Sequence, residues 1–188
     1  MLSVHNQLFL KRIFWISLQP MKIQRYFKAV FLVIAIILYL PSLVPAQEST
    51  AKFTRKELYA AMASSDVATV DNQLNALKNT DLKEKSAYEG ALTMKKAGLV
   101  KGANKKLKFF KEGHKKLEAA ISKDKDNGEL RFLRLMIQEH APGMLHYKND
   151  LDKDSTYIRQ SFKKLPVDVQ QAITSYSKTS KVLRPEDF

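Results

Sequence analysis

The sequence predicts an all-α fold, a bundle or array of about seven amphipathic helices that follows an N-terminal signal segment. Two observations support this prediction. From residue 54 onward, apolar residues recur three and four positions apart, which is the spacing of one helix face. Residues that favour helix starts and stops interrupt these patterns, and no run of alternating apolar residues indicates a strand.

The expected helix boundaries rest on residues that satisfy the free hydrogen-bonding groups at helix ends. Thr54 can accept from the amide of Glu57 while the Glu57 carboxylate reaches back, which is a capping box. In chain order, the expected starts are Thr54, Ser65-Asp66, Asp81 with Glu84, Ala103, Glu129, Asp152 or Asp154, and Pro166. The clearest expected ends are Ser64, Lys101-Gly102, Ser122, and Ala141 before Pro142-Gly143.

Each expected helix carries an apolar stripe that we expect to face a shared core. The stripe of the fourth helix contains Leu107, Phe110, His114, Leu117 and Ile121. The other stripes contain Val67, Val70, Leu74 and Leu77 in the second helix; Tyr88, Ala91, Leu92 and Leu99 in the third; Tyr157, Ile158, Phe162 and Leu165 in the sixth; and Val169, Ile173 and Tyr176 in the seventh. The 142 residues after position 46 are enough to build such a core without disulfides.

The composition excludes several classes of protein. The chain has 188 residues, of which 45% are apolar and 27% charged, and these are the proportions of a globular protein. Because it contains no cysteine, it has no disulfide framework, no thiolate metal site and no thiol nucleophile. Its formal net charge is +13, and all 19 acidic residues lie at or after Glu48.

Residues 21–46 have the features of an export signal. Three basic residues in the first eight positions of this segment precede an apolar run at residues 29–40. The sequence Val-Pro-Ala at residues 44–46 ends in the small residue that a signal peptidase accepts. This pattern predicts cleavage between Ala46 and Gln47 and an exported protein, either periplasmic or secreted.

The alternative is an inner-membrane anchor formed by residues 29–44, although the apolar run is shorter than the ~20 residues that span a bilayer. We interpret residues 1–20 as a non-native or extended N-terminal leader, because Met21 can itself start translation. Residues 47–188 then form a single all-α domain. It carries 27 basic and 19 acidic residues, a formal net charge of +8.

A short stretch of the chain resembles the tetratricopeptide repeat. Gly113, Leu117 and Ala120 have the spacing of the second helix of that repeat, and residues 123–127 (KDKDN) resemble its terminal turn. Lys125 stands at the position of the repeat's proline, and no second copy follows at a period of about 34 residues. The resemblance covers about half a repeat.

A broader resemblance covers most of the expected domain. Residues 129–142 (ELRFLRLMIQEHAP), followed by Tyr147 and an acidic cap, resemble segments of an uncharacterised family of exported helical proteins from Bacteroidota. Residues 172–183 (AITSYSKTSKVL) fit the same group. This resemblance implies an envelope location and an all-α fold, and it supplies no catalytic residue.

The strongest surface feature is a basic stretch at residues 101–125, with nine lysines and three acidic residues. On a helix that turns ~100° per residue, one face collects Lys101, Lys105, Lys108, Lys111 and Lys115, flanked by Lys106 and Lys116. This face is either a solvated surface or a site for polyanions such as envelope phospholipid, lipopolysaccharide phosphate or an acidic partner. Nucleic acid is disfavoured, because the stretch lacks arginines and interleaved surface aromatic residues.

Arg131 and Arg134 interrupt the apolar run of the fifth helix and share one of its faces. They either pair with carboxylates of a neighbouring helix or form the anion-binding end of a groove. Tyr147 is a further candidate for lining such a groove. A concave surface that also contained Tyr88 or Phe109 would favour a peptide partner.

No pattern of residues predicts a catalytic, metal or cofactor site. Residues 150–154 alternate Asp with other residues as a calcium loop does, but the loop's Gly and Glu positions hold Ser155 and Ser161. His140 and His146 are six positions apart with a Pro-Gly break between them, unlike a zinc pair one turn apart. The chain also lacks a nucleophile elbow and a phosphate-binding glycine loop.

We therefore expect a non-enzymatic exported domain, without a cofactor, that acts as an interaction module or envelope accessory protein. The alternative function is binding of a polyanion or an anionic lipid surface through the basic stretch. The third is an enzyme whose site no motif reveals. The partner would be a protein or another envelope component.

Overall fold

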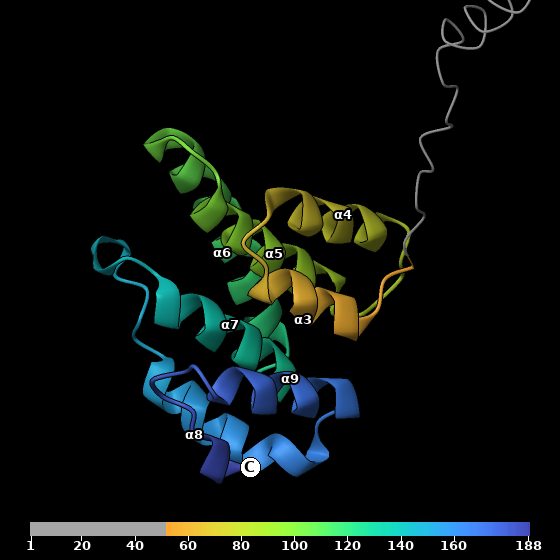
Figure 1. Cartoon of the computed structure of the whole chain (residues 1–188), viewed down its shortest axis with the longest axis vertical. Helices are drawn as coiled ribbons and strands as arrows, with labels where there is room; N and C mark the ends of the chain where they lie inside the picture. The colour runs from red at the N-terminus through yellow and green to blue at the C-terminus, as the bar shows by residue number, and fades with distance from the viewer. Residues whose placement is uncertain (1–51) are drawn as a thin grey trace, which may run out of the picture. The chain divides into compact units, whose positions relative to one another are not determined.

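The computed structural model describes residues 52–188, which form seven α-helices, three short 3-10 helices and no strand (Figure 1). The all-α fold is confirmed for this part of the chain. The α-helices are α3 (Arg55–Ala63), α4 (Val67–Lys78), α5 (Lys85–Leu99), α6 (Ala103–Lys123), α7 (Gly128–His140), α8 (Leu151–Ser161) and α9 (Val167–Ser177). The 3-10 helices are η1 (Gly143–Leu145), η2 (Phe162–Lys164) and η3 (Pro185–Asp187).

All described residues belong to one compact unit. The predictions for residues 1–20, for residues 21–46 and for cleavage between Ala46 and Gln47 lie outside the described residues. None of the helices within residues 52–188 is long and apolar enough to cross a membrane.

Local hydrogen bonds explain where several helices begin. The Thr54 hydroxyl accepts a hydrogen bond from the amide of Glu57 at 3.2 Å, which is one half of the predicted capping box; between these two residues no return bond from the Glu57 carboxylate is present. Asp66 caps α4 by accepting from two backbone amides, at 3.2 and 2.9 Å. Asn127 caps α7 in the same way through its side-chain oxygen.

The predicted starts of the third and sixth helices are wrong. α5 begins directly after Glu84, which makes no side-chain cap, and Asp81 lies in the preceding loop. α8 begins at Leu151, so Asp152 and Asp154 lie inside the helix and do not cap it. The Asp154 carboxylate binds two arginines of α7 instead, a tertiary interaction that local patterns do not show.

Two glycines allow α5 and α6 to pack as a close antiparallel hairpin. A Cβ atom on Gly90 would lie 2.7 Å from the amide nitrogen of Leu117, and one on Gly113 would lie 2.5 Å from the carbonyl oxygen of Gly90. Both distances are too short for a side-chain carbon, so the two helix backbones touch at this crossing. Figure 1 shows the turn of the hairpin extending beyond the neighbouring helices.

α7 is the central helix of the unit. Every residue from Gly128 to Gln138 is buried, its two arginines included. α7 contacts α5 and α6 on one side and α8 on the other, while α3 packs against both α5 and α9 (Figure 1). The largest fully buried apolar side chains come from all the helices and include Leu58, Leu77, Tyr88, Leu92, Leu117, Phe132, Leu133, Leu135, Ile158 and Ile173.

One residue of the predicted α6 stripe lies outside the core. Leu107 is 42% exposed, whereas Leu117 and Ile121 are buried as predicted. The physical reason is the length of the hairpin, because its turn and the first turns of α6 extend past the helices that would cover them. Every residue from Lys101 to Lys108 is exposed.

Candidate functional site

The basic face of α6 consists of Lys105, Lys108, Lys111, Lys115 and Lys116 of the helix and of Lys101 in the turn before it. All six side chains are exposed; Lys101, Lys105 and Lys108 lie in the projecting part of the hairpin, and Lys111, Lys115 and Lys116 follow along α6. Gly102 adopts a φ of 90°, a conformation that favours glycine, and this lets the chain turn from α5 into α6 within three residues. Five of the six lysines thus lie on one helix, directly after this turn.

Few carboxylates neutralise this basic face. Lys116 pairs with Glu89 at 2.6 Å, and Lys108 lies 4.0 Å from Glu112. Within residues 52–188, the other four lysines have no carboxylate within 4.0 Å. Their ammonium groups are therefore available to an external anion. The exposed Leu107 lies between Lys106 and Lys108 in the sequence.

Arg131 and Arg134 lie inside the fold and bind one carboxylate. Arg131 donates to Asp154 at 3.0 Å, and Arg134 donates to both oxygens of Asp154 at 2.7 and 2.8 Å. Arg134 also lies 3.0 Å from Glu118 and 3.4 Å from Asp150. Burial lowers the pKa of Arg134, but the hydrogen bonds to Asp154 and the charge of Asp154 together have a larger effect in the opposite direction. The pKa of Arg134 is therefore raised. The structure therefore places carboxylate partners at these two buried arginines.

Tyr147 is buried beside the same network. Its hydroxyl donates to Glu118, and its ring makes edge contacts with Phe110 and His114 at centroid distances of 5.5 and 4.8 Å. Burial and the hydrogen bond to Glu118 raise the pKa of Tyr147. The three residues proposed for a groove thus belong to one internal network that joins α6, α7 and α8.

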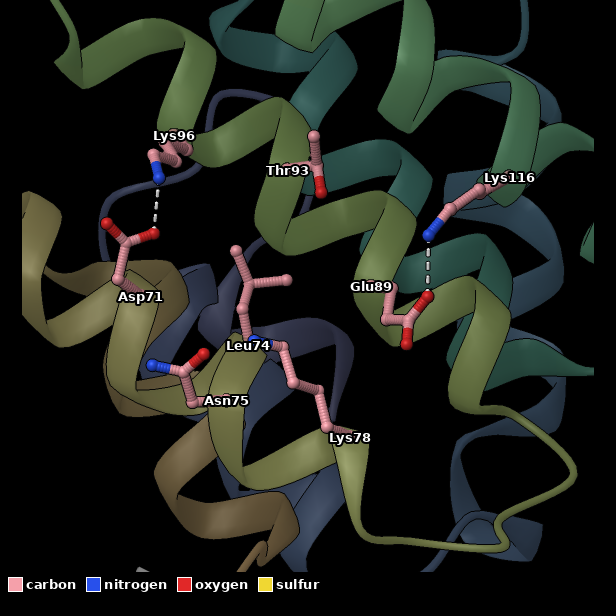
Figure 2. A pocket seen from close by; sticks show the side chains of 8 residues that line it. All are labelled: Asp71, Leu74, Asn75, Lys78, Glu89, Thr93, Lys96 and Lys116. Carbon is pink, nitrogen blue, oxygen red and sulfur yellow. Dashed lines mark hydrogen bonds and ion pairs between the residues drawn. The ribbon is translucent and has the colours of Figure 1, made fainter. Parts of the chain in front are cut away.

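A groove of about 510 Å³ lies between α4, α5 and α6, and we call it the α4–α6 groove (Figure 2). It is lined by Asp71, Leu74, Asn75 and Lys78 of α4, by Glu89, Thr93 and Lys96 of α5, and by Lys116 of α6. Two ion pairs flank it, one between Lys96 and Asp71 at 2.5 Å and one between Lys116 and Glu89 at 2.6 Å. Lys116 also belongs to the basic face, so the two surfaces adjoin.

The α4–α6 groove was not predicted, although the sequence contains a signal for it. Polar residues recur four and then three positions apart on both of its walls. They are Asp71, Asn75 and Lys78 on α4, and Glu89, Thr93 and Lys96 on α5. This spacing places each set on one side of its helix. Only the packing of the helices shows that the two sides face each other.

A second pocket of about 360 Å³ lies between α3, α7 and α9, with Tyr59 and Tyr176 among its lining residues. The Tyr59 hydroxyl donates to the buried Glu129 at 3.3 Å, and Arg55 Nε lies 3.1 Å from the same carboxylate. Burial raises the pKa of Glu129, although the charge of Arg55 acts in the opposite direction. Glu129 therefore joins α7 to α3 through internal hydrogen bonds.

The residues considered for metal binding do not form one site. His140 lies 3.2 Å from the hydroxyl of Tyr176, whereas His146 is exposed in the loop before α8. Asp154 is held by the arginines of α7, and Asp152 is exposed. In the part of the chain that the structure describes, no three His, Asp or Glu side chains are placed to hold a metal ion.

No protein-family model matches the chain, and neither a curated protein nor a solved structure matches it significantly.

Proposed function

We propose that this protein is an exported, non-enzymatic module that associates with an anionic membrane surface through the basic face of α6. One observation carries the proposal. Four of the six lysines on this face have no carboxylate within 4.0 Å in residues 52–188, and all four are exposed along the hairpin turn and α6. Lysines that served a structural role would be paired or packed.

The expected strength follows from charge. Each lysine near an anionic bilayer contributes ~1 kcal/mol, and the positive field extends ~8 Å at physiological salt. Because α6 holds five of these lysines along its length, several of them can approach a flat surface together.

The other parts of the proposal rest on the sequence and on side-chain partners. Residues 21–46 have the pattern of an export signal. The buried groups with potential reactivity, Glu129, Tyr147 and Asp154, bind other side chains of the fold. These contacts support a structural role for them.

The test is sedimentation of the purified protein with lipid vesicles. We expect it to sediment with phosphatidylglycerol vesicles and to remain in solution with phosphatidylcholine vesicles. Salt at ~0.5 M should release it, because screening shortens the field of the lysines. The combined variant Lys105→Gln, Lys108→Gln, Lys111→Gln and Lys115→Gln should lose the association and keep its helical circular dichroism.

A matched control changes the same number of charges elsewhere. Lys153, Lys163, Lys164 and Lys178 are exposed on the α8–α9 side of the unit. Their combined change to Gln should leave vesicle binding intact. Equal loss in both quadruple variants would show that net charge alone drives binding. Failure of the parent protein to bind anionic vesicles at low salt would overturn the proposal.

A further inference from the structure

The α4–α6 groove contains polar groups that the fold does not use. The carboxamide of Asn75, the hydroxyl of Thr93 and the ammonium of Lys78 have no side-chain hydrogen bond or ion pair with any residue in 52–188. Asn75 and Lys78 are exposed, and Thr93 is half-buried. The groove's other charged groups, by contrast, are paired across its sides.

Figure 2 shows how these groups are arranged. Asn75 lies on α4 and Thr93 on α5, and Leu74 of α4 lies between them in this view. The ion pair of Lys96 with Asp71 and that of Lys116 with Glu89 lie at separate places along the groove. The site therefore offers hydrogen-bonding groups on two sides, one apolar contact and one unpaired ammonium.

We propose that the α4–α6 groove binds a short acidic peptide segment in an extended conformation. The Asn75 carboxamide has both a donor and an acceptor, so it matches the paired N–H and C=O groups of a peptide backbone. The Thr93 hydroxyl serves a further backbone group from the opposite wall. Leu74 packs against an apolar side chain of the peptide, and Lys78 pairs with a carboxylate.

The charges of the groove favour an acidic ligand. Three ammonium groups, those of Lys78, Lys96 and Lys116, face two carboxylates, so one positive charge remains after internal pairing. The volume of about 510 Å³ is also in the range of ordinary ligand sites.

The same charges disfavour a small bare anion. Lys78 offers a free phosphate only one unpaired ammonium, because Lys96 and Lys116 are already paired with the carboxylates of Asp71 and Glu89. A peptide can instead place its neutral backbone beside them and its carboxylate at Lys78.

This site goes beyond the proposed function and does not depend on it. The membrane proposal requires the basic face of α6, whereas the peptide site requires Asn75 and Lys78 of α4. Lys116 is the one residue common to both. A negative result with vesicles therefore leaves the peptide site standing, and a negative result with peptide leaves the membrane proposal standing.

The test uses fluorescence anisotropy with a fluorescein-labelled peptide of repeating Glu-Leu-Ser. We expect saturable binding by the purified protein at ~0.15 M salt. An unlabelled copy of the peptide should compete, whereas a Lys-Leu-Ser repeat should not. Free glutamate and inorganic phosphate should not compete either, because they lack the backbone that Asn75 and Thr93 would bind.

Two single variants locate the site. Asn75→Ala and Lys78→Gln should each weaken peptide binding about tenfold or more, which corresponds to ~1.4 kcal/mol. The matched controls are Asn79→Ala and Lys148→Gln, since both residues are exposed and lie outside the groove lining. These controls should bind the peptide like the parent, and all four variants should keep the parent's circular dichroism.

Any of the following results would overturn the proposal. Absence of peptide binding, or parent-like binding by Asn75→Ala and Lys78→Gln, would exclude the groove as the peptide site. Competition by free phosphate or glutamate would show a small-anion site. If the quadruple variant of the basic face loses peptide binding while the two groove variants retain it, the peptide binds to the basic face and not to the groove.

Discussion

Arg134 holds Asp154 by two parallel hydrogen bonds, with Nε 2.7 Å from one carboxylate oxygen and Nη2 2.8 Å from the other. Asp154 is fully buried, and Arg131 adds a third bond at 3.0 Å. A carboxylate removed from water to this extent needs its cationic partners, and they need it. This pairing joins α8 to the central helix.

Replacement of Asp154 by Asn should destabilise the protein by ~3–5 kcal/mol, because it leaves two buried guanidinium groups without their common carboxylate. The measurement is the free energy of unfolding in urea. Asp152→Asn is the matched control, since Asp152 is exposed and lies two positions before Asp154 on the same helix. Its effect should stay within ~0.5 kcal/mol. Equal losses in the two variants would contradict a special role for Asp154.

Replacing each of two glycines of α5 by alanine should change the stability in opposite directions, because only Gly90 lies at the crossing with α6. Gly90→Ala should destabilise the protein by ~1–3 kcal/mol, because the new Cβ meets backbone atoms of α6 that cannot move aside. At Gly98 a Cβ would meet nothing within 4 Å. Gly98→Ala should therefore stabilise by up to ~1 kcal/mol through helix propensity.

Urea denaturation of both variants checks this pair. Stabilisation by Gly90→Ala would show that α5 and α6 are not in backbone contact. Destabilisation by Gly98→Ala would show that the end of α5 differs from the helix described above.

Two leucines of α6 separate the buried part of the helix from its projecting part. Leu117→Ala should cost ~2–5 kcal/mol, because it opens a cavity at a fully buried position. Leu107→Ala should change the free energy of unfolding by no more than ~0.5 kcal/mol, since that side chain is exposed. Thermal or urea unfolding measures both. Similar midpoints for the two variants would place the start of the core elsewhere on α6.

The raised pKa of Glu129 predicts how the stability of the protein changes with pH. Burial raises its pKa in the folded protein above the usual value of 4.5, so the folded state binds this proton more tightly than the unfolded state. Its stabilising contribution is complete below pH 4.5 and is lost as the pH rises through the folded pKa.

The Glu129→Gln variant lacks this titration and isolates the effect. The difference in the free energy of unfolding, parent minus variant, should decrease as the pH is raised above 4.5. Urea denaturation over a pH series measures it. A difference that stays constant or increases would show that the pKa of Glu129 is not raised.

Much of the helical fold could be predicted because its signals are local. The hydroxyl of Thr54 and the carboxylate of Asp66 cap helices within three residues of themselves, so their roles can be read from neighbouring positions. The start of α8 could not be read this way. Asp154 looks like a cap in sequence, but the arginines that bind it lie 20 and 23 positions earlier.

The surfaces were predictable to different degrees. The basic face could be predicted because one helix carries five of its six lysines. The α4–α6 groove requires two helices to be aligned, and neither Asn75 nor Thr93 is unusual on its own helix. Leu107 has the right spacing for the core, but spacing does not tell where the neighbouring helices end.

The contact between α3 and α9 has a consequence for how the domain comes apart. These are the first and last α-helices of the described chain, and over 100 positions separate them. Closing so long a loop is entropically costly, so this contact should form late in folding. Once it has formed, neither end can fray without uncovering side chains beneath the other. The helices should therefore lose their structure in one cooperative transition, and a protease should find no partly opened intermediate to cut.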